Sequence, residues 1–437
     1  MVVYGASTTM SLSAESIIYN LFVVLLIGVS AMLISKRVNV SFVPLLIVLG
    51  LVLGSLVRVL NTYVVRRLFD YVRVLGLVII LFSEGHNLHW PVLKKHITTI
   101  GTLDTVSLVI TAIIAGLVFS YVFHLPFLAG FLFGAIISAT DPATLIPLFR
   151  QHKVREDLKT ILITESIFND PLGIVLTTLA VALILPKAPS ARFLASMARY
   201  VPIYVASVIY FLYEVAVSIL IGVALGVLAY YTIKYLGFER SDEIFLFSLA
   251  IAFLGFFVGE KLGASGYLVA TVIGIVLGNH HTFFKEKASE ALRMQTLIDS
   301  EVHFNEILAT FATVFIFVLL GASVRIDVLM EAAIPSIITA LAVILIARPI
   351  AALPIIPVGK WSWKEYLFMS LEGPRGVVPS ALATLPLFLG ITYHVPKLVY
   401  WGEYILTATF MTVLISIIVE TSWLPYIKKW LLGIEAE

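Results

Sequence analysis

Long apolar segments recur along nearly the whole chain, separated by short polar connections. Runs of roughly 17–25 apolar residues are each long enough to cross the hydrocarbon core of a bilayer as a helix, in which the backbone polar groups bond internally. A membrane β-barrel would instead show segments of about ten residues with alternating polarity. We therefore expect an all-α polytopic membrane protein embedded in the lipid bilayer.

The composition excludes several other classes of protein. Of the 437 residues, 60% are hydrophobic and 13% are charged, whereas soluble proteins have about 45–50% apolar and about 25% charged residues. The net charge is only +2 and the basic residues are scattered through the connections, so nucleic-acid binding has no support. The chain has no cysteine and no Walker A, G-x-S-x-G or H-E-x-x-H motif, so we expect neither an enzyme nor a cofactor.

Thirteen membrane spans are predicted, centred near residues 25, 49, 79, 109, 136, 172, 222, 251, 271, 312, 341, 376 and 412. The stretch from Tyr200 to Lys234 is too long for one helix, so an interfacial segment that starts near Arg192 is expected to lead into the seventh span. The N-terminal segment lacks the basic region of a signal peptide, and we expect the first apolar run to be a retained helix.

The distribution of Lys and Arg predicts the orientation, because cytoplasmic connections are enriched in them. With the N-terminus outside, 17 of the 29 basic residues fall in cytoplasmic connections and 10 in outside connections. The remaining two, Arg348 and Arg375, lie within spans. The split favours a cell-membrane protein with its N-terminus outside and its C-terminus in the cytoplasm.

Two pairs of similar segments indicate an internal repeat. VLGLVLGS (48–55) and VIGIVLGN (272–279) share a Gly-x-x-x-Gly spacing. ATDPAT (139–144) and EGPRGVVP (372–379) each carry a proline in an apolar run, and the two pairs are offset by nearly the same length of chain. Seven spans separate the copies, so the copies must have opposite orientations. Inverted repeats with helices broken at matching positions indicate a transporter's midplane substrate site, although the glycine pair alone is equally compatible with ordinary helix packing.

Asp141 is the first candidate for an ion site. A charge at the bilayer centre costs at least about 2.5–3.5 kcal/mol on insertion scales, so ionisable residues within spans are functional candidates. Asp141 lies between Thr140 and Pro142 in the middle of an apolar run, and Pro142 frees a backbone carbonyl one turn earlier. An unwound turn would present carbonyl oxygens beside a carboxylate, which suits a hard monovalent cation. The alternative is a simple proline kink with a helix-capping aspartate.

A second group of polar residues lies in the sixth span, in TESIFNDPLG (164–173). Glu165 and Asn169 share one helical face, and Ser166 and Asp170 share the adjacent face, because residues four apart are neighbours on a helix. These side chains can line a single small cavity. The alternative, a hydrogen-bonded seam between helices, would be costly with two bare carboxylates.

Arg375 in EGPRG needs a buried acidic partner, because its guanidinium does not deprotonate in practice. The sequence leaves Glu165, Glu372, Asp141 and Asp170 open as that partner. The planar guanidinium would suit any of these carboxylates.

Other ionisable residues are expected to have lesser roles. Asp104 and Arg348 form a second possible pair, with a structural role favoured over ion binding. Glu84 and His303 lie near predicted span ends, where solvated side chains are expected, although either could tune a response to pH.

These motifs resemble those of the NhaP-type branch of the monovalent cation/proton antiporter family, close to its archaeal members. The matching segments are ATDP (139–142), ESIFND (165–170) and EGPRG (372–376), in the family's order and spacing, and the thirteen-span plan covers essentially the whole chain. The resemblance implies a homodimer with a six-helix ion-transport bundle in which the fifth and twelfth spans are unwound and cross. The bundle would include about 74–185 and 303–390, and the dimerisation scaffold about 16–60 and 200–280.

The resemblance also implies roles for single residues. The sodium ion would be bound by Asp141, Asp170, Ser166, Glu165 and the Thr140 carbonyl, with Asn169 and Arg375 supporting the site. In the family, the arginine that matches Arg375 pairs with the glutamate that matches Glu165. In electrogenic relatives, an aspartate replaces Asn169 and a lysine replaces the arginine.

The expected function is electroneutral exchange of sodium or lithium for protons by alternating access, with cation and proton competing for the buried carboxylates. The alternative is a passive channel for monovalent cations, which needs a continuous pore and no coupling between ion and proton. A membrane scaffold without transport would leave the carboxylate cluster unexplained.

Overall fold

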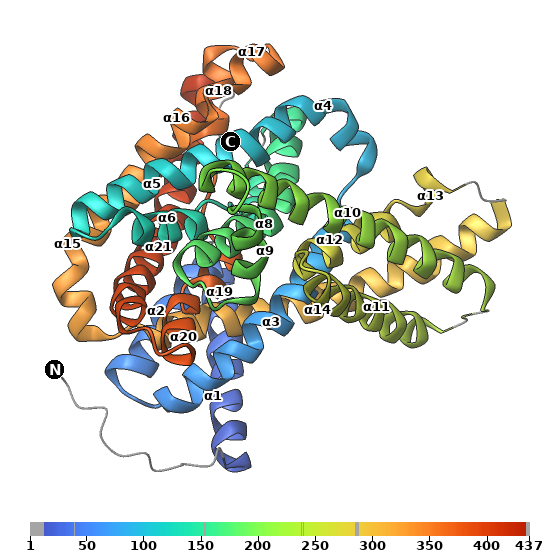
Figure 1. Ribbon diagram of the computed structural model, residues 1–437. Helices are drawn as coiled ribbons and strands as arrows, with labels where there is room; N and C mark the ends of the chain where they lie inside the picture. Colours follow the sequence, from blue (N-terminus) through green and yellow to red (C-terminus); the bar gives the residue numbers. More distant parts are fainter. Residues whose placement is uncertain are drawn as a thin grey trace.

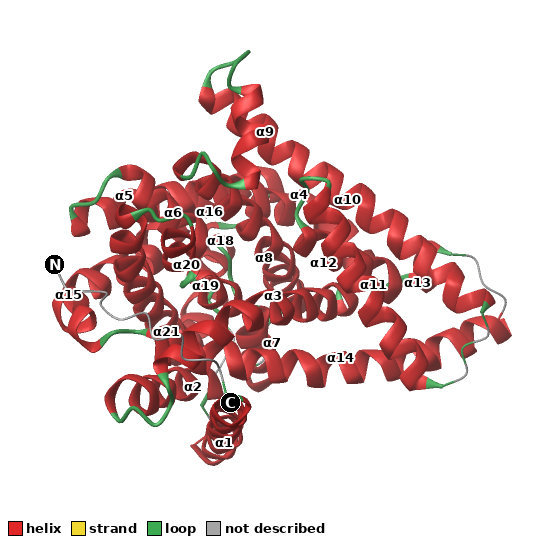
Figure 2. Ribbon diagram, turned by 60° about the horizontal axis from the view of Figure 1, so that its bottom comes forward, coloured by secondary structure: helices red, strands yellow, loops and turns green. Residues whose placement is uncertain are grey.

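The computed structural model describes residues 13–38, 40–152, 154–236, 238, 240–284 and 288–433, and these residues form helices joined by short loops, with no strand among them (Figures 1 and 2). Within this part of the chain, eight helices are long and apolar enough to cross a membrane, and one bent pair would make nine. Three shorter apolar helical segments add to these. The expected all-α membrane architecture is confirmed.

The first half of the chain contains two π-helical turns, η1 and η2, within an otherwise α-helical series. Its elements are α1 (Ala14–Val38), α2 (Phe42–Leu51), η1 (Val52–Leu56), α3 (Thr62–Asn87), α4 (Trp90–Thr102), η2 (Leu103–Ser107), α5 (Leu108–Phe123), α6 (Phe127–Ile137), α7 (Pro142–Gln151) and α8 (Glu156–Ile184).

The second half contains the π-helical turn η3 and ends in the longest helix described. Its elements are α9 (Pro189–Met197), α10 (Ile203–Tyr235), α11 (Ser241–Lys261), α12 (Gly266–Gly278), α13 (His280–Phe283), α14 (Ala288–Ser323), α15 (Ile326–Ala342), η3 (Val343–Ala347), α16 (Arg348–Ala352), α17 (Ile355–Gly359), α18 (Trp363–Leu371), α19 (Val377–Leu382), α20 (Leu385–Thr392) and α21 (Pro396–Leu432).

These elements are consistent with the thirteen predicted spans. Twelve of the predicted centres lie in a helix, and the centre near residue 376 lies at the break between α18 and α19. The prediction for residues 200–234 was wrong in one respect, because α10 is a single helix of 33 residues. At about 1.5 Å per residue it is about 50 Å long, and a long helix can tilt or extend beyond the hydrocarbon. The short helix α9 precedes it, around Arg192.

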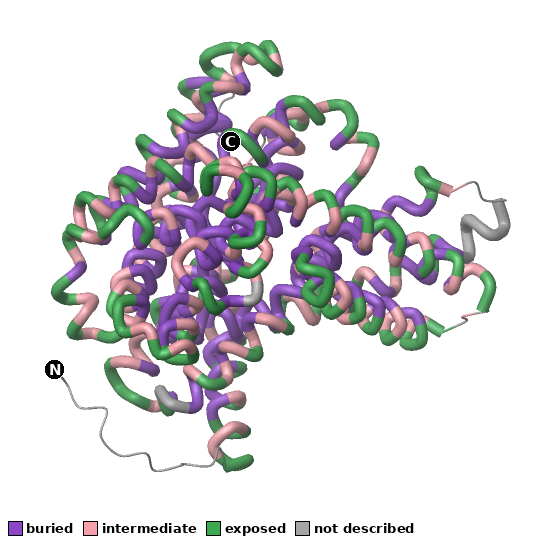
Figure 3. The backbone as a smooth tube through the Cα atoms, in the orientation of Figure 1, coloured by how far each residue is buried: buried purple, intermediate pink, exposed green. Residues whose placement is uncertain are grey.

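In Figure 1, α10–α13 lie to the right of α3, with α14 running along them, and α5, α6, α15 and α21 lie on the left. Buried residues are concentrated in the interior around α6, α8 and α12 (Figure 3). Large apolar side chains on α1, α10 and α15 are exposed, for example Phe22, Leu220 and Ile334. Such an exposed apolar surface is suited to lipid rather than to water.

The predicted repeat is present in the packing of α2 on α14 and of α12 on α3. Gly50 of α2 lies so close to α14 that a Cβ atom on it would overlap the carbonyl group of Val318. Gly274 of α12 lies in the same way on the carbonyl group of Phe82 in α3. Gly50 and Gly274 occupy the same place in the two glycine segments, 48–55 and 272–279. The two contacts are therefore made at equivalent positions of the two copies.

The same equivalence recurs where the partner helices supply the glycine. A Cβ atom on Gly321 of α14 would overlap the carbonyl of Ile47, and one on Gly85 of α3 would overlap the carbonyl of Thr271. Ile47 and Thr271 each directly precede their glycine segment. Gly85 and Gly321 are separated by the same number of residues as Phe82 and Val318, so they too occupy equivalent positions of the two copies. In each helix pair one helix comes from each copy, and glycine is needed because the two backbones touch.

Candidate ion-binding site

The first helix break separates α6 from α7. Helix α6 ends at Ile137 and α7 begins at Pro142, with a bend of 41° between them. Pro142 occupies the first helical position, where its missing N–H costs nothing. Asp141 caps α7, since its Oδ2 accepts hydrogen bonds from the backbone N of Thr144 at 2.8 Å and from the Thr144 hydroxyl. The alternative of a capping aspartate is thus realised, but the cap is only 1% exposed and lies in the interior.

The second break, between α18 and α19, crosses the first. Helix α18 ends at Leu371 and α19 begins at Val377. The backbone N of Asp141 donates to the carbonyl oxygen of Pro374 at 2.8 Å, and the N of Val377 donates to Asp141 Oδ1 at 3.4 Å. Gly376 lies against the carboxyl group of Asp141, where a Cβ atom would overlap the Cγ of Asp141. The Asp141 carboxylate is thus held between the two breaks, at the positive end of α7.

Arg375 stabilises the opposite side of the crossing. Its Nη1 donates to the carbonyl oxygens of Ser138 at 2.6 Å and Ala139 at 3.2 Å, at the end of α6. Its backbone N donates to Ser416 Oγ of α21 at 3.0 Å. A cation at a helix C-terminus satisfies unpaired carbonyls and opposes the helix dipole.

The expected pair between Arg375 and Glu165 is wrong. Glu165 pairs instead with Arg348, with Nη1–Oε1 and Nη2–Oε2 distances of 2.5 and 2.8 Å. Among the described residues, no carboxylate lies within ion-pair distance of Arg375. The other suggested pair, Asp104 with Arg348, is also not formed, and Asp104 Oδ1 is buried without a hydrogen-bond partner. Arg348 is the first residue after the π-helical turn η3, and it is buried against Glu165 of α8.

Residues of α8 bind the first break through side-chain hydrogen bonds. The backbone N of Thr140 donates to Asn169 Oδ1 at 3.0 Å, and Asn169 Nδ2 donates to Thr140 Oγ1 at 2.8 Å. The hydroxyl groups of Thr140 and Ser166 are 2.8 Å apart. The structure therefore brings together the predicted residues of the two motifs, and Asn169 holds the unwound segment in place.

Asp170 is the buried carboxylate of this group that has no hydrogen-bond partner in the described part of the chain. It is 1% exposed, and both carboxyl oxygens are buried and unpaired. It lies within electrostatic range of Asp141 and Glu84. Buried charges in proteins are normally paired, so this position calls for a proton or a cation.

Glu84 and His303 differ from each other in environment. His303 is exposed on α14, as expected for a solvated residue. Glu84 lies near the end of α3, but its Oε2 is buried without a hydrogen-bond partner and interacts electrostatically with Asp141. Glu84 as a whole is half-buried, so the expected solvated position holds only in part, and its buried oxygen belongs to the surroundings of the site.

Three residues of α21 that the sequence reasoning missed fix the second break. Glu420 Oε2 accepts from the backbone N of Gly373 at 2.6 Å, and Trp423 Nε1 donates to Glu372 Oε1 at 3.1 Å. Ser416, Glu420 and Trp423 lie at positions i, i+4 and i+7 of α21 and so share one helical face. That polar stripe in an apolar helix was the available signal.

Known proteins match nearly the whole chain. The family description "Sodium/hydrogen exchanger, transmembrane" matches residues 21–430. Two proteins of Methanocaldococcus jannaschii are similar: probable Na(+)/H(+) antiporter 2 is 34% identical over 414 residues, covering 89% of this chain and 91% of its own, and Na(+)/H(+) antiporter 1 is 33% identical over 430 residues, covering 94% of each.

A solved structure agrees with this match. The sodium proton antiporter MjNhaP1 of the same organism, at pH 8, superposes with a TM-score of 0.83 and 31% sequence identity, covering 96% of this chain and 99% of its own. These relatives are transporters rather than enzymes. Together with the crossed helix breaks, the matches show that this chain is a transmembrane member of the sodium/hydrogen exchanger family.

Proposed function

We propose that this protein exchanges sodium or lithium ions for protons, one for one, across the cell membrane by alternating access. The observation that carries the proposal is the unpaired, buried carboxylate of Asp170 within electrostatic range of Asp141 at the crossed helix breaks. The printed names of the relatives, Na(+)/H(+) antiporters, supply the two ions. Such exchange would serve pH homeostasis.

The cation and the proton compete for the same oxygens. A buried carboxylate favours its neutral, protonated form, and a bound cation favours the charged form. Asp141, Asp170, Ser166 and the Thr140 carbonyl supply oxygen ligands of the kind that hard cations prefer. Glu165, the further ligand implied by the resemblance, has both carboxylate oxygens on Arg348. Sodium and protons are cargo, and the exchange needs no cofactor.

Asn169 and Arg375 support the site without exchanging protons. Asn169 bonds both the backbone and the side chain of Thr140, and an amide has no proton to release at physiological pH. Arg375 remains charged and caps α6. Glu165 is engaged by Arg348 at 2.5 Å. If only Asp141 and Asp170 take part in exchange, the site carries the same charge with one Na⁺ as with one H⁺, and one ion replaces the other.

The moving body is the ion-transport bundle, which the resemblance gives as about 74–185 and 303–390. Because α3 and α14 pack on α12 and α2 through the glycine contacts, we propose instead that 74–87 and 303–323 belong to the scaffold. The bundle then begins after α3, between Asn87 and Trp90, and again after α14, between Ser323 and Ile326. The scaffold helices, including 16–60 and 200–280, form the contact of a homodimer in the bilayer. The N-terminus is outside and the C-terminus is cytoplasmic.

Proteoliposomes test the proposal against a passive cation channel. An imposed pH gradient, acidic inside, is followed with a pH-sensitive dye while Na⁺, Li⁺ or K⁺ is added outside. Exchange requires cation-dependent loss of the proton gradient without an added counter-ion pathway. A channel would instead conduct the cation when no proton gradient exists and would dissipate a cation diffusion potential.

A further inference from the structure

We propose that Ser55 and Asn279 are two symmetry-related anchors that fix the pivots about which the ion-transport bundle turns on its scaffold. They are the residues that follow the glycine motifs of the two repeat copies, and each bonds the short connector through which the chain passes from scaffold to bundle. The inference rests on the proposed alternating-access function and adds the positions of its pivots.

Asn279, at the end of α12, binds both sides of the connector between α3 and α4. Its Nδ2 donates to the carbonyl oxygen of Leu88 at 2.7 Å, and its Oδ1 accepts from the backbone N of Trp90 at 2.8 Å. Leu88 is the first residue after α3, and Trp90 is the first residue of α4. The Asn279 side chain is fully buried. It therefore fixes the point where the scaffold ends and the bundle begins.

Ser55 binds the equivalent connector between α14 and α15. Its Oγ donates to the carbonyl oxygen of Val324 and lies 3.3 Å from that of Ala322. Val324 is the first residue after α14, as Leu88 is after α3. Ser55 and Asn279 are each the last residue of their glycine segment. Leu88 and Val324 are separated by the same number of residues as Gly85 and Gly321, so they are equivalent positions of the repeat. The two bonds are therefore one feature of the repeat, present at opposite ends of the inverted pair.

The scaffold beside these anchors is closely packed, which gives the pivots a firm base. A Cβ atom on Gly278, next to Asn279, would overlap the backbone of His86, and one on Gly54, next to Ser55, would overlap the backbone of Ala322. Close backbone contact leaves the scaffold helices little freedom to slide. Each connector to the bundle is only two residues long, so rotation is confined to those residues.

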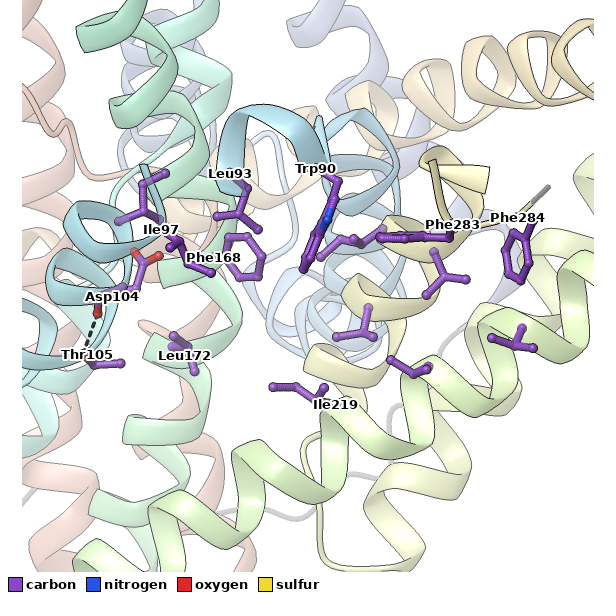
Figure 4. Close-up of a pocket in the computed structure, with 17 residues that line it drawn as sticks. Trp90, Leu93, Ile97, Asp104, Thr105, Phe168, Leu172, Ile219, Phe283 and Phe284 are labelled. Atoms are coloured by element: carbon purple, nitrogen blue, oxygen red, sulfur yellow. Dashed lines mark hydrogen bonds between the residues drawn. The ribbon is translucent and has the colours of Figure 1, made fainter. Parts of the chain in front are cut away.

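A cavity of about 630 Å³ provides the room for such a rotation (Figure 4). It is lined on one side by α4, η2 and α8 of the bundle and on the other by α10, α12 and Phe283–Phe284 of the scaffold. Trp90 lines it, and its ring packs on Phe283 with centroids 5.2 Å apart. Trp90, whose backbone N–H is bound by Asn279, therefore also lies at the edge of the cavity between the bundle and the scaffold.

The two anchors are unequal. Asn279 bonds backbone groups on both sides of its connector, whereas the Ser55 hydroxyl bonds only carbonyls that precede α15. The connector at Asn279 is therefore the stiffer pivot, and its loss has the larger effect. Asn279→Ser, which installs the residue of the symmetry-related position, keeps a donor for Leu88 and tests this difference.

The test compares Asn279→Ala, Asn279→Ser and Ser55→Ala with the wild type in proteoliposomes, together with Na⁺ affinity measured by calorimetry in detergent. We expect Asn279→Ala to lower the maximal exchange rate by about tenfold or more, because two buried backbone groups lose their partner and the connector samples unproductive orientations. The Na⁺ dissociation constant should stay within about twofold, since no site oxygen is touched. Ser55→Ala and Asn279→Ser should lie between Asn279→Ala and wild type.

Asn20→Ala is the matched control. Asn20 is also buried and also bonds a backbone carbonyl, Ser16 O, and a backbone amide, Asn61 N, but it joins α1 to the loop before α3 within the scaffold. It should lower the melting temperature without the selective loss of rate. Equal rates in Asn279→Ala and wild type, or equal losses in Asn279→Ala and Asn20→Ala, would overturn the pivot alone. Absence of exchange in the wild type would overturn the proposed function as well.

A second variant decides the matter if Asn279→Ala does not fold. Val223→Trp adds bulk to the α10 wall of the cavity, and Ile334→Trp places the same ring on an exposed position of α15, outside both the cavity and the proposed dimer contact. We expect Val223→Trp to slow exchange with unchanged Na⁺ affinity, and Ile334→Trp to exchange like the wild type. A Val223→Trp protein as fast as its control would show that the bundle does not turn into this cavity.

Discussion

Asp141 and Pro374 are joined backbone to backbone, with the amide N of Asp141 2.8 Å from the carbonyl oxygen of Pro374. This bond ties the two broken helices together at the point where they cross. It leaves the Asp141 side chain to cap α7 and to accept from the N of Val377. The carboxylate is therefore positioned by both repeat copies, so that movement of either break changes its surroundings.

Replacing Asp170 by Asn should abolish exchange in a folded protein. The side chain must alternate between holding a proton and holding a cation. An amide cannot release a proton and carries no negative charge for a cation, so it can do neither. Asp141→Asn should lose or severely weaken exchange for the same reason. Asp242→Asn, at an exposed position, is the control. Cation-dependent decay of a pH gradient in proteoliposomes is the measurement, and full activity in Asp170→Asn would refute the site.

Gly376→Ala should impair exchange although it changes no ionisable group. The added Cβ atom would overlap the Cγ of Asp141, so the carboxyl group must move. Displacement of about 1 Å at a functional group can cost about a hundredfold in rate. Gly101→Ala is the matched control, because nothing lies within 4 Å of the position of its Cβ. Similar exchange rates for the two alanine variants would show that Gly376 does not position Asp141.

The Glu165–Arg348 pair should be visible as coupling between mutations. Removing one partner of a buried pair leaves an uncompensated charge and costs about 3–5 kcal/mol. We expect Glu165→Ala and Arg348→Ala each to lower the melting temperature in detergent, and the double variant to lose less than the sum of the two. Additive losses would mean that the two side chains do not interact.

Arg375 provides the comparison for the coupling between Glu165 and Arg348. Its guanidinium bonds the carbonyls of Ser138 and Ala139 rather than a carboxylate. Arg375→Ala should therefore destabilise the α6–α7 break and add nearly independently to Glu165→Ala. Stronger coupling of Glu165 to Arg375 than to Arg348 would restore the pairing expected from the resemblance.

The sequence motifs predicted the residues of the candidate site but not all of their pairings. Prolines within apolar runs indicated both breaks, and helical spacing placed Ser166, Asn169 and Asp170 on neighbouring faces. The partner of Glu165, Arg348, directly follows the π-helical turn η3. A π turn inserts an extra residue and changes the face on which the following residues lie, which regular α-helical periodicity cannot predict.

The repeat was partly visible for a similar reason. Gly-x-x-x-Gly and the two prolines marked equivalent positions, whereas the equivalence of Leu88 and Val324 has no sequence signature, because only their backbone carbonyls take part. Glu420 was missed because it lies in the last third of α21, where a charge could have been solvated. Its bond to Gly373 depends on tertiary packing.

The last prediction concerns stoichiometry, and it follows from the groups that titrate at the site. Asn169 bonds Thr140 with both its amide atoms and has no proton to exchange, and Arg375 keeps its charge at physiological pH. One Na⁺ at Asp141 and Asp170 therefore carries the same charge as one H⁺, and exchange should be electroneutral. The measurement is transport in proteoliposomes under a potassium/valinomycin potential, where one charge moving through 100 mV would be worth about 2.3 kcal/mol. We expect a rate and an end point that do not depend on the potential. An end point that shifts with voltage would require a second proton, for which Glu84 is the first residue to test, because its carboxylate interacts with Asp141 and Asp170.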